Sequence, residues 1–140
     1  MPTGVDSWAL DTSVAVAALD ESHETHRACR RVAMKYRPAL AGHAAFETYA
    51  VLTRLPGAAR ATPETAMKLL NLAFPKRCWL TPRQHDKLIE RLADLDIAGG
   101  MVYDALIAEA ARANNLTLLT RDTRALRTYE RVAVRFEFVE

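Results

Sequence analysis

The sequence predicts an α/β fold in which helices cover both faces of a parallel β-sheet. Short apolar segments that can form buried strands alternate with longer segments of helical pattern. The 140 residues contain no repeat, no low-complexity tract and no linker long enough to separate domains. A chain of this length holds one domain with a real core and is too short for two, so we expect a single domain over residues 1–140.

Two strands and three helices are expected in the first part of the chain. Residues 8–10, Trp-Ala-Leu, are an apolar run that predicts a buried strand, and a helix over 14–19 follows it. A helical pattern over 23–36 leads to a second strand at 38–41, which its alanines make weak. The next helix covers 43–55, and a Pro-Gly pair ends it.

Threonine followed by proline marks the start of two helices in the second part of the chain. Thr62 and Thr81 can each cap a helix, and proline is favoured at the first helical position. The last apolar segment alternates Val, Val, Phe and Phe, which is typical of a strand. In order, we expect helix 62–74, strand 78–80, helix 81–94, helix 101–113, strand 116–120, helix 123–129 and strand 132–139.

The overall charge is too small to hold the protein on nucleic acid by itself. There are 19 Lys and Arg residues against 17 Asp and Glu, a formal net charge of +2. A local basic surface is compatible with this total, and five arginines lie between residues 121 and 135. A solvated helix face explains any single one of these arginines at least as well as a binding role.

Several features indicate a cytoplasmic globular protein. Cys29 and Cys78 lie far apart and form no CxxC motif, so we expect buried thiols in a reducing compartment. No apolar run approaches the roughly 20 residues of a membrane-spanning helix. The first residues lack the basic and apolar regions of a secretory signal. We therefore expect no membrane association.

Acidic side chains follow predicted strands at the edge of the sheet where ligands bind in parallel α/β folds. Asp11 comes directly after the first strand, Glu47 about one turn into the helix after the second, and Asp122 two residues after strand 116–120. From Asp104 the helix rises roughly 15 Å to residue 114, and the next strand returns about the same distance. Asp104 is therefore expected at the same edge as the other three acids.

Each acid also has a purely structural interpretation. Asp11 and Asp122 can cap helices, Asp104 favours the first turn of its helix, and Glu47 can pair with Arg54 on the surface. The combination at one edge favours a functional site instead. Like charges this close repel one another unless a cation joins them, and a hard divalent ion such as Mg²⁺ or Mn²⁺ prefers oxygen ligands.

Zinc is a poorer candidate for this edge of the sheet. The residues that usually bind it are histidine and cysteine. None of the four histidines stands at ligand spacing near the acids, at positions 23, 26, 43 and 85.

Four short motifs in order carry a family resemblance over nearly the whole chain, from about Trp8 to the end. They are Leu10-Asp11-Thr12-Ser13, Phe46-Glu47-Thr48 with Arg54 downstream, Tyr103-Asp104-Ala105-Leu106-Ile107-Ala108, and Leu119-Thr120-Arg121-Asp122. In these residues the chain resembles the PIN-domain nucleases, and within them the VapC-like toxins of toxin–antitoxin pairs. The resemblance implies a three-layer α/β/α sandwich with a mainly parallel sheet of about five strands.

The resemblance also implies an activity, a site and partners. The activity would be a Mg²⁺- or Mn²⁺-dependent endoribonuclease, and the partners an RNA substrate, a second copy in a homodimer and a small cognate antitoxin whose tail lies beside the active site. The acidic site would be Asp11, Glu47, Asp104 and Asp122, with metal held by Asp11, Asp104 and Asp122. Thr12, Ser13 and Thr120 would orient the carboxylates, and we expect Arg54, Arg121 and Arg124 to contact RNA phosphates.

Two features depart from the family pattern. An extra stretch, 1–7, precedes the first strand, and we expect its Asp6 not to be catalytic. Asp96 stands before Asp104 and could be a fifth, outer acid, although a loop residue is the simpler interpretation. Residues 44–73 are rich in Ala, Leu, Val and Phe, which core packing mostly explains and which could also serve a dimer or antitoxin contact.

Other classes of α/β protein fit less well. A haloacid-dehalogenase phosphatase needs Asp-x-Asp after the first strand, and Ser13 stands where the second acid should be. A receiver domain needs paired acids near the first strand and a late lysine after a strand, and neither is present. A PIN-like domain used only for binding would be marked by loss of one of the acids, and all four are present. We therefore expect metal-assisted phosphodiester hydrolysis, with Glu47 orienting or deprotonating water or holding a second ion.

Overall fold

A five-stranded, all-parallel sheet forms the centre of the molecule. The computed structural model describes residues 7–140. The strands lie in the order β3-β2-β1-β4-β5, so β1 (Trp8–Leu10) stands in the middle between β2 (Ala39–Ala41) and β4 (Thr117–Thr120). β3 (Arg77–Cys78) and β5 (Phe136–Phe138) form the two edges. The predicted α/β class with about five parallel strands is confirmed.

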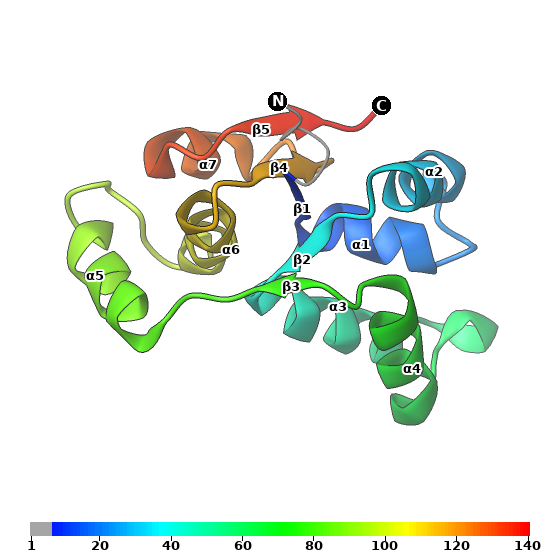
Figure 1. Cartoon of the computed structure of the whole chain (residues 1–140). Coiled ribbons are helices and arrows are strands. Elements are labelled where there is room, and N and C mark those ends of the chain that lie inside the picture. The colour runs from blue at the N-terminus through cyan, green and yellow to red at the C-terminus, as the bar shows by residue number, and fades with distance from the viewer. Residues whose placement is uncertain (1–6) are drawn as a thin grey trace.

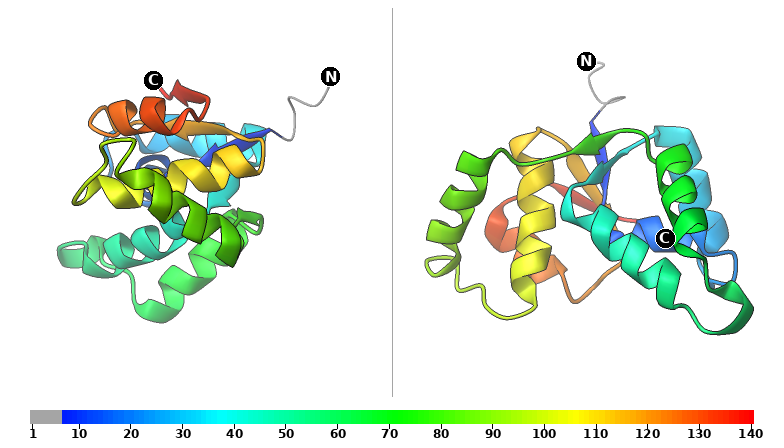
Figure 2. Two further views of the ribbon diagram at one scale, coloured as in Figure 1. Left: turned by 90° about the vertical axis from the view of Figure 1, so that its left-hand side faces the viewer. Right: turned by 90° about the horizontal axis from the view of Figure 1, so that it is seen from below.

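Helices cover both faces of this sheet (Figures 1 and 2). On one side, α1 packs against α2 and α3, and α3 packs against α4. On the other side, α6 packs against α5 and α7. The bounds are α1 Thr12–Leu19, α2 His26–Tyr36, α3 His43–Arg54, α4 Pro63–Ala73, α5 Pro82–Leu92, α6 Met101–Ala113 and α7 Leu126–Val132, with a 3₁₀ turn at Gly57–Ala59.

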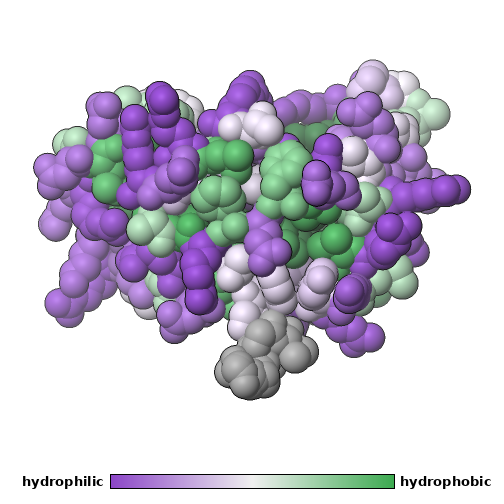
Figure 3. Space-filling view, turned by 90° about the horizontal axis from the view of Figure 1, so that it is seen from above, coloured by the Kyte–Doolittle hydropathy of each residue, from purple (hydrophilic) through white to green (hydrophobic). Residues whose placement is uncertain are grey.

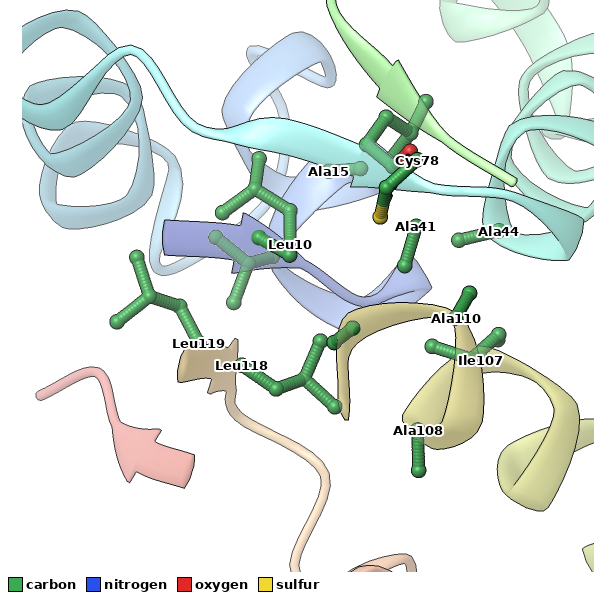
Figure 4. Close-up of a cluster of buried hydrophobic side chains, with 14 of the residues drawn as sticks. Leu10, Ala15, Ala41, Ala44, Cys78, Ile107, Ala108, Ala110, Leu118 and Leu119 are labelled. Carbon is green, nitrogen blue, oxygen red and sulfur yellow. Dashed lines mark hydrogen bonds between the residues drawn. The ribbon is translucent and has the colours of Figure 1, made fainter. Parts of the chain in front are cut away.

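The core lies between the sheet and the two helix layers. Leu10, Leu118 and Leu119 on the central strands are buried, and Ile107 meets them from α6 (Figure 4). Many other core positions are alanines, which let the helices approach the short strands closely. Cys29 and Cys78 are buried free thiols, as expected. Within residues 7–140, no helix has both the length and the apolar character needed to cross a membrane.

The capping signals placed the helix starts well. Thr62 accepts a hydrogen bond from the Thr65 amide, and Thr81 forms a capping box with Gln84 at the start of α5. The helix expected over 23–36 begins at His26 instead, because 20–25 form turns held by Asp20 and His23.

The expected strand at 132–139 is wrong in its first half. Val132 is the last residue of α7, and Ala133 ends that helix in a left-handed conformation, so only Phe136–Phe138 form the strand. Val132 and Val134 are nevertheless buried. The alternating apolar pattern therefore reflects burial at a helix end and in a loop, and not a strand. The strand expected at 78–80 is also displaced, because β3 pairs with β2 through Arg77 and Cys78, while Trp79 is half exposed.

Candidate active site

Asp11 occupies the point where the central strand becomes a helix. Its side chain caps α1 by accepting a hydrogen bond from the Val14 amide at 3.2 Å, and the Ser13 hydroxyl donates to the same oxygen at 2.6 Å. The Tyr129 hydroxyl donates to the other oxygen at 2.7 Å. Burial raises the pKa of Asp11, and these hydrogen bonds, with one from Thr120, act against the rise. Four hydrogen bonds from uncharged donors therefore fix the orientation of the Asp11 carboxylate.

Glu47 is held by two side chains from different elements. The Thr12 hydroxyl at the start of α1 donates to Glu47 Oε1 at 2.6 Å. His43 lies one turn earlier on α3, with its Nε2 3.7 Å from Glu47 Oε2, and its ring stacks on Tyr103. The surface pair with Arg54 that the sequence allowed is therefore not what positions Glu47.

Asp104 lies in the first turn of α6, the residue after Tyr103. Burial raises the pKa of Asp104 to about 6, with further contributions from the negative charges of Asp122, Glu47 and Asp11, and Arg124 acts in the opposite direction. That all three other acids act on Asp104 shows that the fold brings the four carboxylates into one electrostatic environment.

Asp122 follows β4 in a short polar turn. Its amide donates to Thr120 Oγ1 at 3.0 Å, and its Oδ1 accepts from the Arg124 amide at 3.0 Å. Ser13 Oγ accepts from the Arg121 amide at 2.8 Å, which joins the end of β4 to the start of α1. Two of the three predicted orienting hydroxyls, Ser13 and Thr120, therefore bond Asp11, whereas Thr12 bonds Glu47.

All four acids line one cavity of about 620 Å³ at the carboxyl edge of the sheet. Val16, Ala50, Val51 and Ile107 give it an apolar side, while residues 23–25 close it from the loop before α2. Arg54 and Arg121 also line the cavity, but Arg124 does not. The Arg121 guanidinium donates to the Val139 carbonyl and lies 5.2 Å from the centre of the Phe138 ring.

Tyr129 and His43 are the residues that sequence reasoning missed. Tyr129 is buried and lies 118 residues from Asp11, so no local pattern could have indicated the contact. Burial and the neighbouring Asp11 raise the pKa of Tyr129, which keeps its hydroxyl a donor. His43 could have been found, because it stands at i,i+4 from Glu47 on one helix face.

The outer acids lie apart from this site. Asp96 is exposed in the loop after α5, its carbonyl accepts a hydrogen bond from Arg131, and it does not line the cavity. Asp6 lies outside the described residues. Over residues 7–140, no three His, Cys, Asp or Glu side chains stand close enough together to form a ready-made metal site.

Comparison with known families defines the class of protein. The PIN domain family model matches residues 9–131, which include all four acids. The chain therefore belongs to the PIN domain family, and the predicted resemblance is confirmed.

The relatives narrow this class to the VapC proteins. The chain is 44% identical over 126 residues to Ribonuclease VapC27 of Mycobacterium tuberculosis, covering 90% of this chain and 92% of that protein. It is 42% identical over 132 residues to Ribonuclease VapC40 of the same species, covering 94% and 98%. The fold also matches the crystal structure of VapBC2 from Rickettsia felis bound to a promoter DNA fragment, with a TM-score of 0.66, 15% identity and coverage of 95% and 98%.

Proposed function

We propose that this protein is the endoribonuclease toxin of a toxin–antitoxin pair and cleaves RNA phosphodiester bonds with the help of Mg²⁺ or Mn²⁺. The observation that carries the proposal is that four carboxylates from separate elements line one cavity at the carboxyl edge of the sheet. Sequence relatives named ribonucleases, similar over nearly their full length, support the same activity.

The chemistry of the donor set fits a hard divalent cation. The cavity offers carboxylate oxygens, and burial together with the charges of the other three acids raises the pKa of Asp104. Asp11, Asp104 and Asp122 would hold the ion. A bound cation would offset the charge that develops on the phosphodiester and favour ionisation of a water molecule.

The side chains of the protein divide the remaining tasks. Ser13, Val14 and Tyr129 hold the Asp11 carboxylate in one orientation. Glu47 is fixed by Thr12 and His43 and would orient the attacking water and accept its proton.

RNA would reach this cavity as an exposed single strand or loop, because a duplex buries its bases. Arg54 and Arg121 stand at the cavity wall and would contact its phosphates. Arg124 points to solvent beside Asp122, so its proposed role is weaker.

The proposed protein partners are a cognate antitoxin and a second copy of this chain. Most apolar residues of 44–73 pack in the core, but Phe46, Met67 and Leu72 are exposed by 65%, 45% and 82%. Exposed apolar groups of this size are typical of protein contacts.

Replacing Asp11 by asparagine tests the activity. Asparagine keeps the oxygen that caps α1 and removes the charge, so we expect near-complete loss of RNA cleavage with little change in thermal unfolding. The measurement is sequencing of RNA ends after a short pulse of expression, beside purified-protein cleavage in Mg²⁺ and in EDTA. Asp86→Asn, an exposed acid on α5, is the matched control and should cleave like wild type. Wild-type cleavage by Asp11→Asn would exclude this site.

A further inference from the structure

One helix outside the candidate site carries a run of cationic residues with no acidic residue among them. Five of the 19 Lys and Arg residues, and none of the 17 Asp and Glu, lie between residues 26 and 37. They are Arg27, Arg30, Arg31, Lys35 and Arg37, on α2 and at its end. The remainder of the chain carries more acidic than basic residues, so α2 is a locally basic element in a chain of small net charge.

Three arginines of α2 are exposed and make no polar contact within the described residues. Arg27, Arg30 and Arg31 are exposed, and residues 7–140 supply them with no hydrogen bond or ion pair. Together with Met34 and Lys35 they line an open hollow of about 490 Å³. Long hydrophilic side chains project over this side of the molecule, at the right of Figure 3.

The arginines expected to bind RNA from the sequence are in a different situation. Arg121 donates to the Val139 carbonyl, and Arg124 lies 3.7 Å from Asp122. Each of these contacts offsets or occupies a guanidinium. Arg121 and Arg124 are therefore less available for phosphate than the arginines of α2.

α2 is also continuous with the candidate active site. Residues 23–25 line the 620 Å³ cavity, and α2 begins at the next residue, His26. Arg27 and Arg31 are one turn apart, about 6 Å along the helix axis, and Lys35 follows about 6 Å further on. A strand whose scissile phosphate lies at the carboxylates can thus continue along a row of cations.

We propose that α2 is the backbone-binding surface for RNA that leads away from the cleavage site, with Arg27, Arg30 and Arg31 contacting phosphates. This inference rests on the proposed function. The face formed by these three arginines favours a polyphosphate strand over a protein, because Met34 is the one exposed apolar side chain in its hollow. The apolar cavity that Arg30 and Met34 share with leucines of α4 lies on the side toward that helix. The contacts would be independent of base sequence.

Paired charge removals on two helices test the proposal. The test variant is Arg27→Gln with Arg31→Gln, and the control is Arg83→Gln with Lys87→Gln, two exposed cations at the same i,i+4 spacing on α5. α5 lies on the opposite side of the sheet and also carries Asp86 and Glu90 (Figure 1). Binding of a labelled single-stranded RNA is followed by fluorescence anisotropy at several salt concentrations, with every protein carrying Asp11→Asn.

The α2 variant should bind about tenfold or more weakly at low salt, and its log–log salt dependence should be shallower by about 0.7 per contact removed. Without Asp11→Asn, its KM for RNA cleavage should rise while kcat changes little. Arg27→Lys with Arg31→Lys should restore both quantities, and the α5 control should stay within about twofold of wild type.

Equal RNA affinity and equal KM for the α2 and α5 variants would overturn the inference, and α2 would then be a surface for another partner. A loss of affinity that does not depend on salt would overturn it as well. Failure of the proposed function is a distinct outcome, because wild type would then bind RNA with the expected α2 dependence and never cleave it.

Discussion

Two carboxylates on α6 show opposite ways of keeping a negative charge inside this protein. Glu109 is buried, and Arg112 donates to both of its oxygens at 2.7 Å, with Arg91 3.6 Å away. Asp104, five residues earlier on the same helix, is partly buried among three other acids, and its pKa is raised to about 6. One carboxylate is neutralised by the protein, and the other is left uncompensated.

The difference separates an acid that the protein itself neutralises from the acids that, in the proposed function, would hold a cation. Two arginines neutralise the charge of a carboxylate and occupy its oxygens, so that these oxygens are not free to bind a cation. In the cavity, by contrast, Asp11 is held by the hydroxyls of Ser13 and Tyr129 and by one amide, all of them neutral. Neutral donors fix the direction of the oxygens without removing their charge, which is the arrangement that a divalent cation requires.

Removing the charge of Asp104 should lower activity, whereas removing the charge of Glu109 should lower stability. Asp104→Asn should lower RNA cleavage by about a hundredfold or more, because an oxygen ligand in the site loses its charge. Glu109→Gln should leave cleavage close to wild type and lower the free energy of unfolding by about 1–2 kcal/mol, since its partly exposed arginines can return to solvent. Cleavage assays and guanidinium unfolding of both variants make the comparison.

Two results would contradict this distinction between Glu109 and Asp104. If Glu109→Gln lost as much cleavage as Asp104→Asn at full stability, Glu109 and its two arginines would belong to the site. If Asp104→Asn cleaved normally, the uncompensated acids would have no role in the reaction.

The sequence predicted the elements whose signals are local. Threonine–proline caps marked α4 and α5, and the apolar run of β4 marked its strand. The predicted bounds of the edge strands were wrong because apolar residues near them are buried for reasons unrelated to strand pairing. Val132 and Val134 alternate in sequence, yet they belong to a helix end and a loop.

The sequence predicted which acids lie at the carboxyl edge of the sheet, because the ends of strands and helices fix their positions. Strand ends placed Asp11 and Asp122, and helix length placed Asp104. The contacts that orient the acids depend on side chains from distant elements, such as Tyr129 on Asp11, and no spacing encodes them. The basic surface was sought at 121–135 because arginines are dense there, whereas an acid count along the chain would have found 26–37.

Removing the Tyr129 hydroxyl tests whether neutral donors prepare Asp11. Tyr129→Phe keeps the ring that packs near Phe136 and loses the 2.7 Å hydrogen bond. We expect Mn²⁺ affinity, measured by calorimetry, to fall about tenfold and the free energy of unfolding to fall by about 1 kcal/mol. Tyr49→Phe, a half-buried tyrosine on α3 that does not line the cavity, is the control. Unchanged Mn²⁺ affinity in Tyr129→Phe would leave the hydroxyl a purely structural role.

The smallest expected effect is the contribution of Asp104 to the pH dependence of stability. Its pKa is raised from 3.8 to about 6 in the folded protein, so between these pH values the folded state holds a proton that the unfolded chain has released. In EDTA, stability should therefore fall as pH rises through this window, by about 1 kcal/mol after allowance for solvent screening. Above about pH 6, the contribution of Asp104 to stability no longer changes with pH.

A bound cation should reverse the sign of this dependence, because it favours the ionised carboxylate. Guanidinium unfolding in saturating Mg²⁺ should show no fall in stability between pH 3.8 and about 6, and stability should instead decrease as pH drops below 3.8. Asp104→Asn should lose this component of both slopes, whereas Glu109→Gln should keep it, since arginines and not a cation compensate Glu109. Identical slopes in EDTA and Mg²⁺ would mean that no ion meets Asp104, and the contrast between the two acids of α6 would then be one of burial alone.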